Sequence, residues 1–192
     1  MQASIKRSRL IPSIVRGLTV VVAVAAGFES AQAEPGPSPS DAPPVAMSGW
    51  RYDKGASDVH LFQCQEAACV PGSRVSYRFY PAGTTMSLAQ YRGEQEAVIK
   101  ALQQRAPQGT SIKIVAIEGE DVATLPRMFK TLRLTIAPDG SQEHVHSGLL
   151  MGEKASVSLI SSSRDEKAAN TSYTQYALAL MLLIHQPRDQ KQ

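Results

Sequence analysis

Apolar and polar side chains alternate with a period of two in several short segments of the chain. In residues 75–80, for example, Val75, Tyr77 and Phe79 alternate with the side chains between them. This period is typical of half-buried strands, and it also predicts a strand at residues 59–64. Further strands are predicted at residues 111–117, 128–137, 143–150 and 155–161.

From Ser87 the spacing of the apolar residues changes to that of a helix. Ser87 and Gln90, which lies three positions later, form a capping-box pattern that predicts the start of this helix. The helix is expected to end before Pro107 and Gly109. Its apolar positions are Leu88, Tyr91, Val98, Ile99 and Leu102.

A second helix is predicted from about Asp165 to His185, where the apolar residues again recur at helical spacing. One stripe of this helix carries Tyr173, Tyr176, Ala177, Leu180 and Ile184. Residues 177–184 are apolar all round, which predicts that this stretch is well buried or meets a partner.

The predicted elements follow the order strand, strand, helix, four strands, helix. Links of hairpin length join the later strands, and such links favour antiparallel pairing. We therefore predict an α+β domain with a mainly antiparallel sheet of about six strands and two main helices packed on it.

The first 48 residues are predicted to be an export signal and a linker, and not part of this domain. Four basic residues precede an apolar run at 17–28, and Ala31-Gln32-Ala33 has the small-x-small form of a signal peptidase site. Residues 1–33 therefore read as a signal peptide, and the run is shorter than the roughly 18 to 20 residues that cross a bilayer. Cleavage near Ala33 predicts a periplasmic or secreted protein without a transmembrane segment. Residues 34–48 are expected to form a disordered Pro-rich linker, and residues 49–192 a single domain.

The formal net charge of +3 comes from the predicted signal peptide. The chain has 20 Lys and Arg against 17 Asp and Glu; four of the basic and one of the acidic residues lie in residues 1–33, which leaves sixteen of each sign. Binding to nucleic acid needs clustered Lys and Arg, and here these alternate with Glu and Asp. No nucleic-acid partner is predicted.

The order of the elements, the predicted export and the closing strand-then-helix segment "VSLISSSRDEKAANTSYTQYALALML" resemble the PsbP-like domains. These are small α/β/α sandwiches of photosynthetic and bacterial exported proteins. The resemblance covers most of the mature chain and rests on element order. It implies a binding or accessory module rather than a catalyst.

The two cysteines, Cys64 and Cys69, have four residues between them and lie at the turn of the first predicted hairpin. The spacing alone is open to a disulfide, a redox pair or a metal pair. A redox site would require C-x-x-C at a helix start, and structural zinc would require a second pair of ligands. In an oxidising compartment two nearby thiols usually pair, so a structural disulfide between Cys64 and Cys69 is predicted, worth roughly 2 kcal/mol.

His144 and His146 are the candidate metal ligands. They lie two positions apart on a predicted strand, so both point to one face, and two imidazoles suit copper or zinc. His60 is the available third ligand. If the turn at 138–140 holds an even number of loop residues, both histidines share a face with Arg133, whose charge would disfavour a cation there. The alternative interpretation is two histidines on a polar face of the sheet.

No catalytic residue and no cofactor are predicted. Ser161, Ser162 and Ser163 stand between a strand and a helix, where Ser162 or Ser163 is expected to cap the helix. The sequence contains no nucleophile elbow, P-loop or zinc-protease motif. The first hypothesis is an exported, non-catalytic binding or accessory domain with a protein partner in the bacterial cell envelope. The alternative is a small periplasmic metal-handling protein that uses His144 and His146.

Overall fold

The computed structural model describes residues 42–185. The predicted signal peptide and the first part of the predicted linker lie outside this range. The end of that linker contacts the domain, because the Val45 N–H donates to the Tyr77 hydroxyl at 3.1 Å and this hydroxyl donates to the Val45 carbonyl at 2.8 Å. The packed part of the chain therefore begins a few residues before the predicted boundary at residue 49.

Seven strands form one antiparallel sheet in the order β1-β2-β3-β7-β6-β5-β4. The α+β class and the antiparallel pairing are confirmed, and the strand count is one higher than predicted. The additional strand is β1, whose sequence WRYDK alternates over only five residues, which is too short a run to stand out as a strand. The strands are β1 (Trp50–Lys54), β2 (His60–Cys64), β3 (Arg74–Pro81), β4 (Ser111–Glu118), β5 (Arg127–Ile136), β6 (Gln142–Met151) and β7 (Ala155–Ser163).

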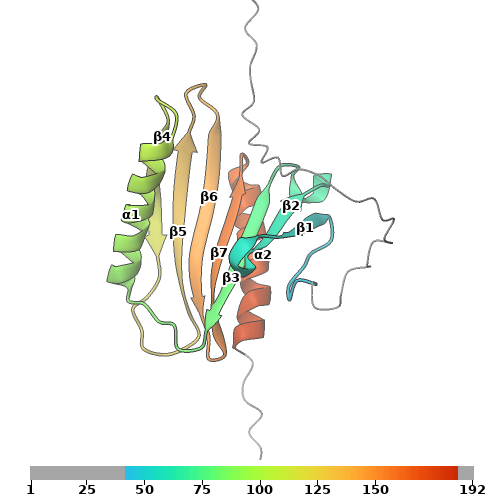
Figure 1. Ribbon diagram of the computed structural model, residues 1–192, viewed down its shortest axis with the longest axis vertical. Helices are drawn as coiled ribbons and strands as arrows, with labels where there is room; N and C mark the ends of the chain where they lie inside the picture. Colours follow the sequence, from blue (N-terminus) through green and yellow to red (C-terminus); the bar gives the residue numbers. More distant parts are fainter. Residues whose placement is uncertain (1–41, 186–192) are drawn as a thin grey trace, which may run out of the picture. The chain divides into compact units, whose positions relative to one another are not determined.

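The two helices lie on opposite faces of the sheet, which makes three layers (Figure 1). Helix α1 (Leu88–Arg105) connects β3 to β4 and packs on β4 and β5 at one edge. Helix α2 (Glu166–Ile184) follows β7 and packs on β6 and β7 from the other side. Because side chains alternate along a strand, neighbouring residues of β5 and β6 contact different helices.

The main core lies between the sheet and α2. The predicted stripe of α2, from Tyr173 to Ile184, is buried there against apolar side chains of the sheet such as Tyr77, Leu150 and Leu159. The outer side of the same helix is not buried, since Leu178 and Leu182 are 64% and 74% exposed. The expectation of a well-buried helix is therefore wrong for this side. Contact with a partner there stays a prediction.

A smaller core lies between the sheet and α1. Tyr91 is the buried residue of α1, and its ring packs on that of Phe129 with the centroids 5.4 Å apart. The predicted capping box is confirmed, since Ser87 and Gln90 each accept a hydrogen bond from the backbone N–H of the other. Val98 and Leu102, which were expected on the packed stripe, are exposed. Helix α1 thus buries little of its own surface against the sheet, and apolar side chains stay exposed along its flank.

Within residues 42–185, no helix covers the other half of that face. Helix α1 packs on β4 and β5, and the same side of β1, β2, β3 and β7 has no helix over it (Figure 1). We call this surface the open face. Its exposed members are Arg51, Asp53, Leu61, Gln63, Arg74, Arg78 and Ile160.

Candidate binding surfaces

His144 and His146 lie on the α2 side of β6, as the predicted shared face requires. His146 is 4% exposed, and neither of its ring nitrogens has a hydrogen-bond partner within residues 42–185. Its ring lies beside that of Tyr173, with the centroids 5.9 Å apart. His144 is less buried, and its Nδ1 is 3.9 Å from the Glu166 carboxylate.

Burial keeps His146 neutral. Loss of hydration, reinforced by the positive charge of Lys130, lowers the pKa of His146 to about 4. The ammonium of Lys130 donates to the Asn170 Oδ1 atom at 3.1 Å and lies 5.2 Å from the centre of the Tyr173 ring. A cation bound at His146 would therefore meet a nearby like charge, which disfavours it.

The like charge beside the histidines was expected from Arg133, and this was wrong. The loop between β5 and β6 comprises the five residues 137–141, because Ile136 pairs with Gln142. An odd loop pairs Leu134 with His144 and Arg133 with Val145, and directly paired residues share a face. Arg133 consequently lies on the α1 side, opposite to both histidines.

The structure does not bring His60 to the histidine pair. His60 is on β2, and two strands, β3 and β7, stand between it and β6. It stacks on Tyr77 with centroids 4.7 Å apart, and its Nδ1 is 3.1 Å from the Tyr52 hydroxyl. Burial, followed by the charge of Lys54, lowers the pKa of His60. Within residues 42–185, no group of three or more His, Cys, Asp or Glu side chains is placed to share a metal ion.

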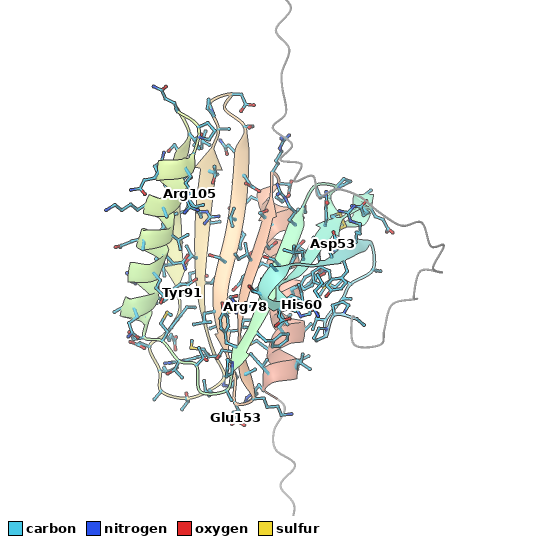
Figure 2. The ribbon with its side chains drawn as sticks, in the orientation of Figure 1. Asp53, His60, Arg78, Tyr91, Arg105 and Glu153 are labelled. Atoms are coloured by element: carbon cyan, nitrogen blue, oxygen red, sulfur yellow. A yellow bond between two sulfur atoms is a disulfide. The ribbon has the colours of Figure 1, made fainter. Side chains whose placement is uncertain are left out.

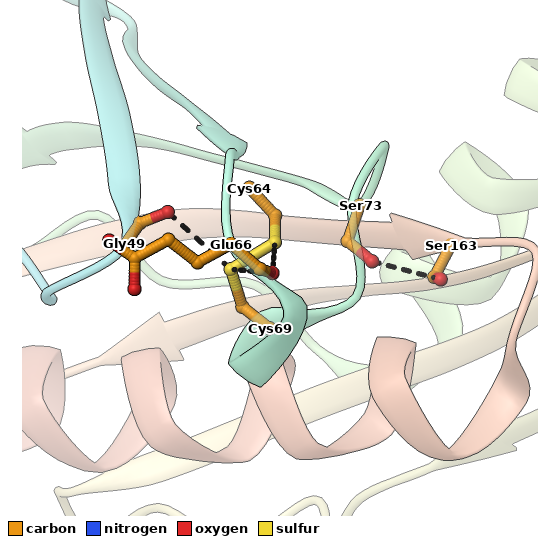
Figure 3. Close-up of a disulfide and its surroundings, with 6 residues drawn as sticks. All are labelled: Gly49, Cys64, Glu66, Cys69, Ser73 and Ser163. Carbon is orange, nitrogen blue, oxygen red and sulfur yellow. Dashed lines mark hydrogen bonds between the residues drawn. A yellow bond between two sulfur atoms is a disulfide. The ribbon is translucent and has the colours of Figure 1, made fainter.

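Cys64 and Cys69 are joined in the link between β2 and β3, with their sulfur atoms 2.10 Å apart (Figure 3). Backbone hydrogen bonds hold the same link: the Cys64 N–H donates to Ser73 and the Gln65 N–H donates to Gly49. Buried Ser73 in turn donates to the Ser163 hydroxyl at 2.9 Å. The bridged link is thus tied to β1 and to the end of β7.

The serine run has a structural role that differs from the predicted one. Asp165, and not Ser162 or Ser163, caps α2 by accepting from the Ala168 N–H at 2.6 Å. Ser163 accepts from the Asp165 N–H, and Ser161 donates to the Ala169 carbonyl at 2.9 Å. A carboxylate at this position also interacts favourably with the helix dipole. These hydroxyls hold β7 to the first turn of α2.

Of the hollows on the α1 side of the sheet, two are candidate binding sites. The first, which we call the α1 groove, is a cavity of about 370 Å³ between α1 and strands β5, β6 and β7. Its walls include Tyr80, Met86, Tyr91, Val98, Leu149 and Ile160, and Arg133 reaches it from β5. The second is a hollow of about 370 Å³ in the open face, lined by Asp53, Leu61, Gln63, Arg74, Ser76 and Ile160 among others.

Positive charge prevails on the open face. Arg51 is paired with Asp53 at 3.2 Å, and Arg74 lies 3.8 Å from Glu143 on β6. The guanidinium of Arg78, which is labelled in Figure 2, lies 5.3 Å from the centre of the Tyr80 ring. Arg78 has no ion-pair partner within residues 42–185. Three guanidiniums therefore stand against two carboxylates, and Arg78 is the one without an ion pair.

The sequence analysis missed both hollows, although the sequence holds a signal for the α1 groove. The period of two in β5 puts Arg133 on the same face as Phe129 and Thr131, and both of these are buried. A charged residue at a core-facing position is uncommon unless it is paired or reaches a cavity. The open face gave no comparable signal, because it depends on where α1 crosses the sheet.

Within residues 42–185, neither α1 nor α2 combines the length and the apolar character that a membrane crossing needs.

Comparison with known proteins supports the fold resemblance and assigns no family. No protein-family model matches the chain, and no curated protein sequence matches it significantly. Among solved structures, the solution structure of cyanobacterial PsbP (CyanoP) from Synechocystis sp. PCC 6803 matches with a TM-score of 0.49 and 12% sequence identity. The match covers 70% of this chain and 81% of that chain. The predicted resemblance to PsbP-like domains is therefore confirmed as a distant likeness of fold, and no functional residue is transferred from it.

Proposed function

We propose that this chain is an exported, non-catalytic domain that binds a protein partner through the open face. The observation that carries the proposal is the uncovered half of the sheet, where Leu61 and Ile160 are 40% and 44% exposed. Exposed apolar side chains gathered on one surface and rimmed by polar groups are typical of interaction sites.

The chemistry of the open face specifies the partner. Its apolar centre is surrounded by arginines, and arginine is enriched at protein interfaces because its planar head binds carboxylates in pairs of hydrogen bonds. Arg78 has no carboxylate partner within the described part of the chain, so it is available for one from outside. We therefore expect a partner that presents an apolar side chain flanked by Asp or Glu.

Site-specific cross-linking tests this proposal. A photoreactive residue replaces Ser76, at the centre of the open face, or Gln104, on the exposed flank of α1 that faces β4, in the full-length chain expressed in its own cells. The Ser76 position should yield one protein adduct, and the Gln104 position should not yield that adduct. The double variant Arg74→Glu, Arg78→Glu should lose the adduct, whereas the control Arg92→Glu, Lys100→Glu on exposed positions of α1 should keep it.

The location of the cross-links decides the outcome. Equal adducts at both positions, or an adduct that survives reversal of the open-face charges, would refute docking through this face. The export part of the proposal has its own test, because cleavage after Ala33 gives a mature protein that begins at Glu34. N-terminal sequencing that finds Met1 on the mature material would exclude it.

Metal handling by His144 and His146 remains a second candidate function. The observation in its favour is the neutral ring of His146, whose two nitrogens have no hydrogen-bond partner in residues 42–185. Neutral imidazole is the form that binds metals. Against it stand the separation from His60 and the charge of Lys130.

A further inference from the structure

We infer that the α1 groove is a second binding site, which takes a small molecule with a carboxylate and a short apolar chain, and that Arg133 binds the carboxylate. This site goes beyond the protein-binding surface proposed above, since its ligand is of another chemical class. Three features carry the inference: the unpaired guanidinium, the apolar walls and the size of the groove.

Arg133 is the uncommitted cation of the groove. Its Nε is buried without a hydrogen-bond partner in the described residues, and none of its nitrogens forms an ion pair there. The carboxylate whose charge acts on it is Glu143, which already lies 3.8 Å from Arg74. A half-buried guanidinium without a partner is unfavourable, so an anion that reaches it gains a strong, charge-assisted hydrogen bond.

Several other polar groups of the groove already form hydrogen bonds within the protein. The Tyr91 hydroxyl accepts from Thr131 at 3.1 Å and donates to the Ser147 carbonyl at 3.3 Å. The Ser147 hydroxyl donates to Gln95 at 3.4 Å. Glu94 also lines the groove and forms no ion pair with Arg133. Arg133 is the cation that lines the groove, so it is the group that fixes the carboxylate end of a ligand.

Apolar side chains supply the place for the rest of the ligand. Val98 and Ile160 line the groove from α1 and from β7, and both are exposed despite their apolar character. Leu149 closes the floor between them. An apolar chain bound here would remove these side chains from water, which is favourable in proportion to the area buried.

Size and charge narrow the ligand class. A volume of about 370 Å³ is at the lower end of the range for small-molecule sites, which runs from roughly 300 to 1,000 Å³. One guanidinium balances the single charge of a carboxylate, whereas a phosphate monoester carries up to two charges and usually meets several donors. An aliphatic monocarboxylate such as octanoate is the simplest probe of this chemistry.

Calorimetric titration of the protein purified from full-length expression tests the inference with three probes. Octanoate carries both features, 1-octanol only the apolar chain and acetate only the carboxylate. We expect octanoate to bind at one equivalent, and 1-octanol to bind at least about 10-fold more weakly, since a hydrogen bond to a charged group contributes about that much. Acetate should show no measurable binding.

Two variants locate the site. Arg133→Met keeps an unbranched apolar stem and removes the charged guanidinium, so it should weaken octanoate binding to the level of 1-octanol. Val98→Glu places an acid on the exposed groove side of α1 and should abolish binding, whereas Gln104→Glu, on the flank of α1 that faces β4, should leave it unchanged. Failure of octanoate to bind, or equal binding by wild type and Arg133→Met, would overturn the inference.

The outcome is independent of the protein-binding proposal. Arg133→Met should leave the cross-link from the Ser76 position intact, and the Arg78→Gln variant should bind octanoate like the wild type. If the wild type binds octanoate but gives no cross-link from the Ser76 position, the protein partner alone is refuted. Retained cross-linking without octanoate binding would refute the groove ligand alone.

Discussion

The buried neutral ring of His146 predicts that acid destabilises the fold well above the pH at which most carboxylates titrate. A histidine in the unfolded chain takes up a proton near pH 6.5, whereas burial holds His146 neutral in the folded protein until about pH 4. Between these values the unfolded state binds more protons than the folded state. The free energy of unfolding therefore falls as the pH falls through this window. Above about pH 7 the contribution of His146 to this free energy does not change with pH.

The size of the effect follows from the shift of the pKa. Because His146 is only 4% exposed, solvent screening does not weaken the argument much. A displacement from 6.5 to about 4 corresponds to about 3 kcal/mol in total, at 1.36 kcal/mol for each pH unit. At pH 4.5 most of the window has been crossed, and the expected loss is about 2 to 3 kcal/mol relative to pH 7.5.

Urea denaturation at pH 7.5 and at pH 4.5 measures this loss. Trp50 contacts the ring of Tyr176 in the main core, with centroids 5.9 Å apart, so its fluorescence reports unfolding. The variant His146→Leu should lose about 2 to 3 kcal/mol less than the wild type between the two pH values, because leucine does not titrate. His144→Gln, two residues away on the same face, is the matched control and should keep the wild-type loss.

The comparison between pH values separates titration from packing. A change of packing in His146→Leu shifts the stability by a similar amount at both pH values and leaves the difference between them unchanged. If the wild type and His146→Leu lose stability in parallel, within about 0.5 kcal/mol, His146 is not held neutral by burial and the reasoning is refuted.

Three further predictions concern the core, the disulfide and the histidine pair. Gly148→Ala should destabilise the protein by about 1 to 3 kcal/mol in urea denaturation, because a Cβ there would meet the Tyr173 hydroxyl and the Phe129 carbonyl. Gly93→Ala, with open space around it on α1, should stabilise the protein by about 0.5 to 1 kcal/mol. Similar effects of the two changes would contradict the packing at Gly148. Denatured, unreduced protein should contain no thiol that reacts with a maleimide, and two labelled cysteines would show that Cys64 and Cys69 are free. Calorimetric titration with copper and zinc should detect no site tighter than micromolar. Tight binding at one equivalent that disappears in the double variant His144→Ala, His146→Ala would establish the metal-handling alternative.

The order and type of the elements could be predicted because local pattern and tertiary packing agree along most of the chain. The stripe of α2 from Tyr173 to Ile184 is both apolar at helical spacing and buried against the sheet. Ser87 begins α1 through a hydrogen bond to a residue only three positions away, so its capping box is readable from sequence. β1 escaped prediction because its membership in the sheet depends on pairing with β2 rather than on its own pattern.

The placement of the site residues depended on information that local pattern does not contain. One loop residue more or less between β5 and β6 decides whether Arg133 shares a face of the sheet with His144 and His146. The distance of His60 from the other histidines depends on the strand order, in which β3 and β7 separate β2 from β6. Long-range pairing of this kind is set by the whole sheet, and the conditional inference about Arg133 therefore failed.

The offset between the two helices links the fold to the proposed functions. Helix α2 covers the aromatic half of the sheet, where Phe62, Tyr77 and Tyr176 pack together, and α1 lies at the opposite edge on the other face. An antiparallel sheet tolerates one solvated face only where that face is polar. The arginines and serines of the open face meet this requirement, whereas Leu61 and Ile160 are apolar exceptions, 40% and 44% exposed. Their exposure beside Arg78, which has no ion-pair partner in residues 42–185, is the feature that the proposed docking of a partner would explain.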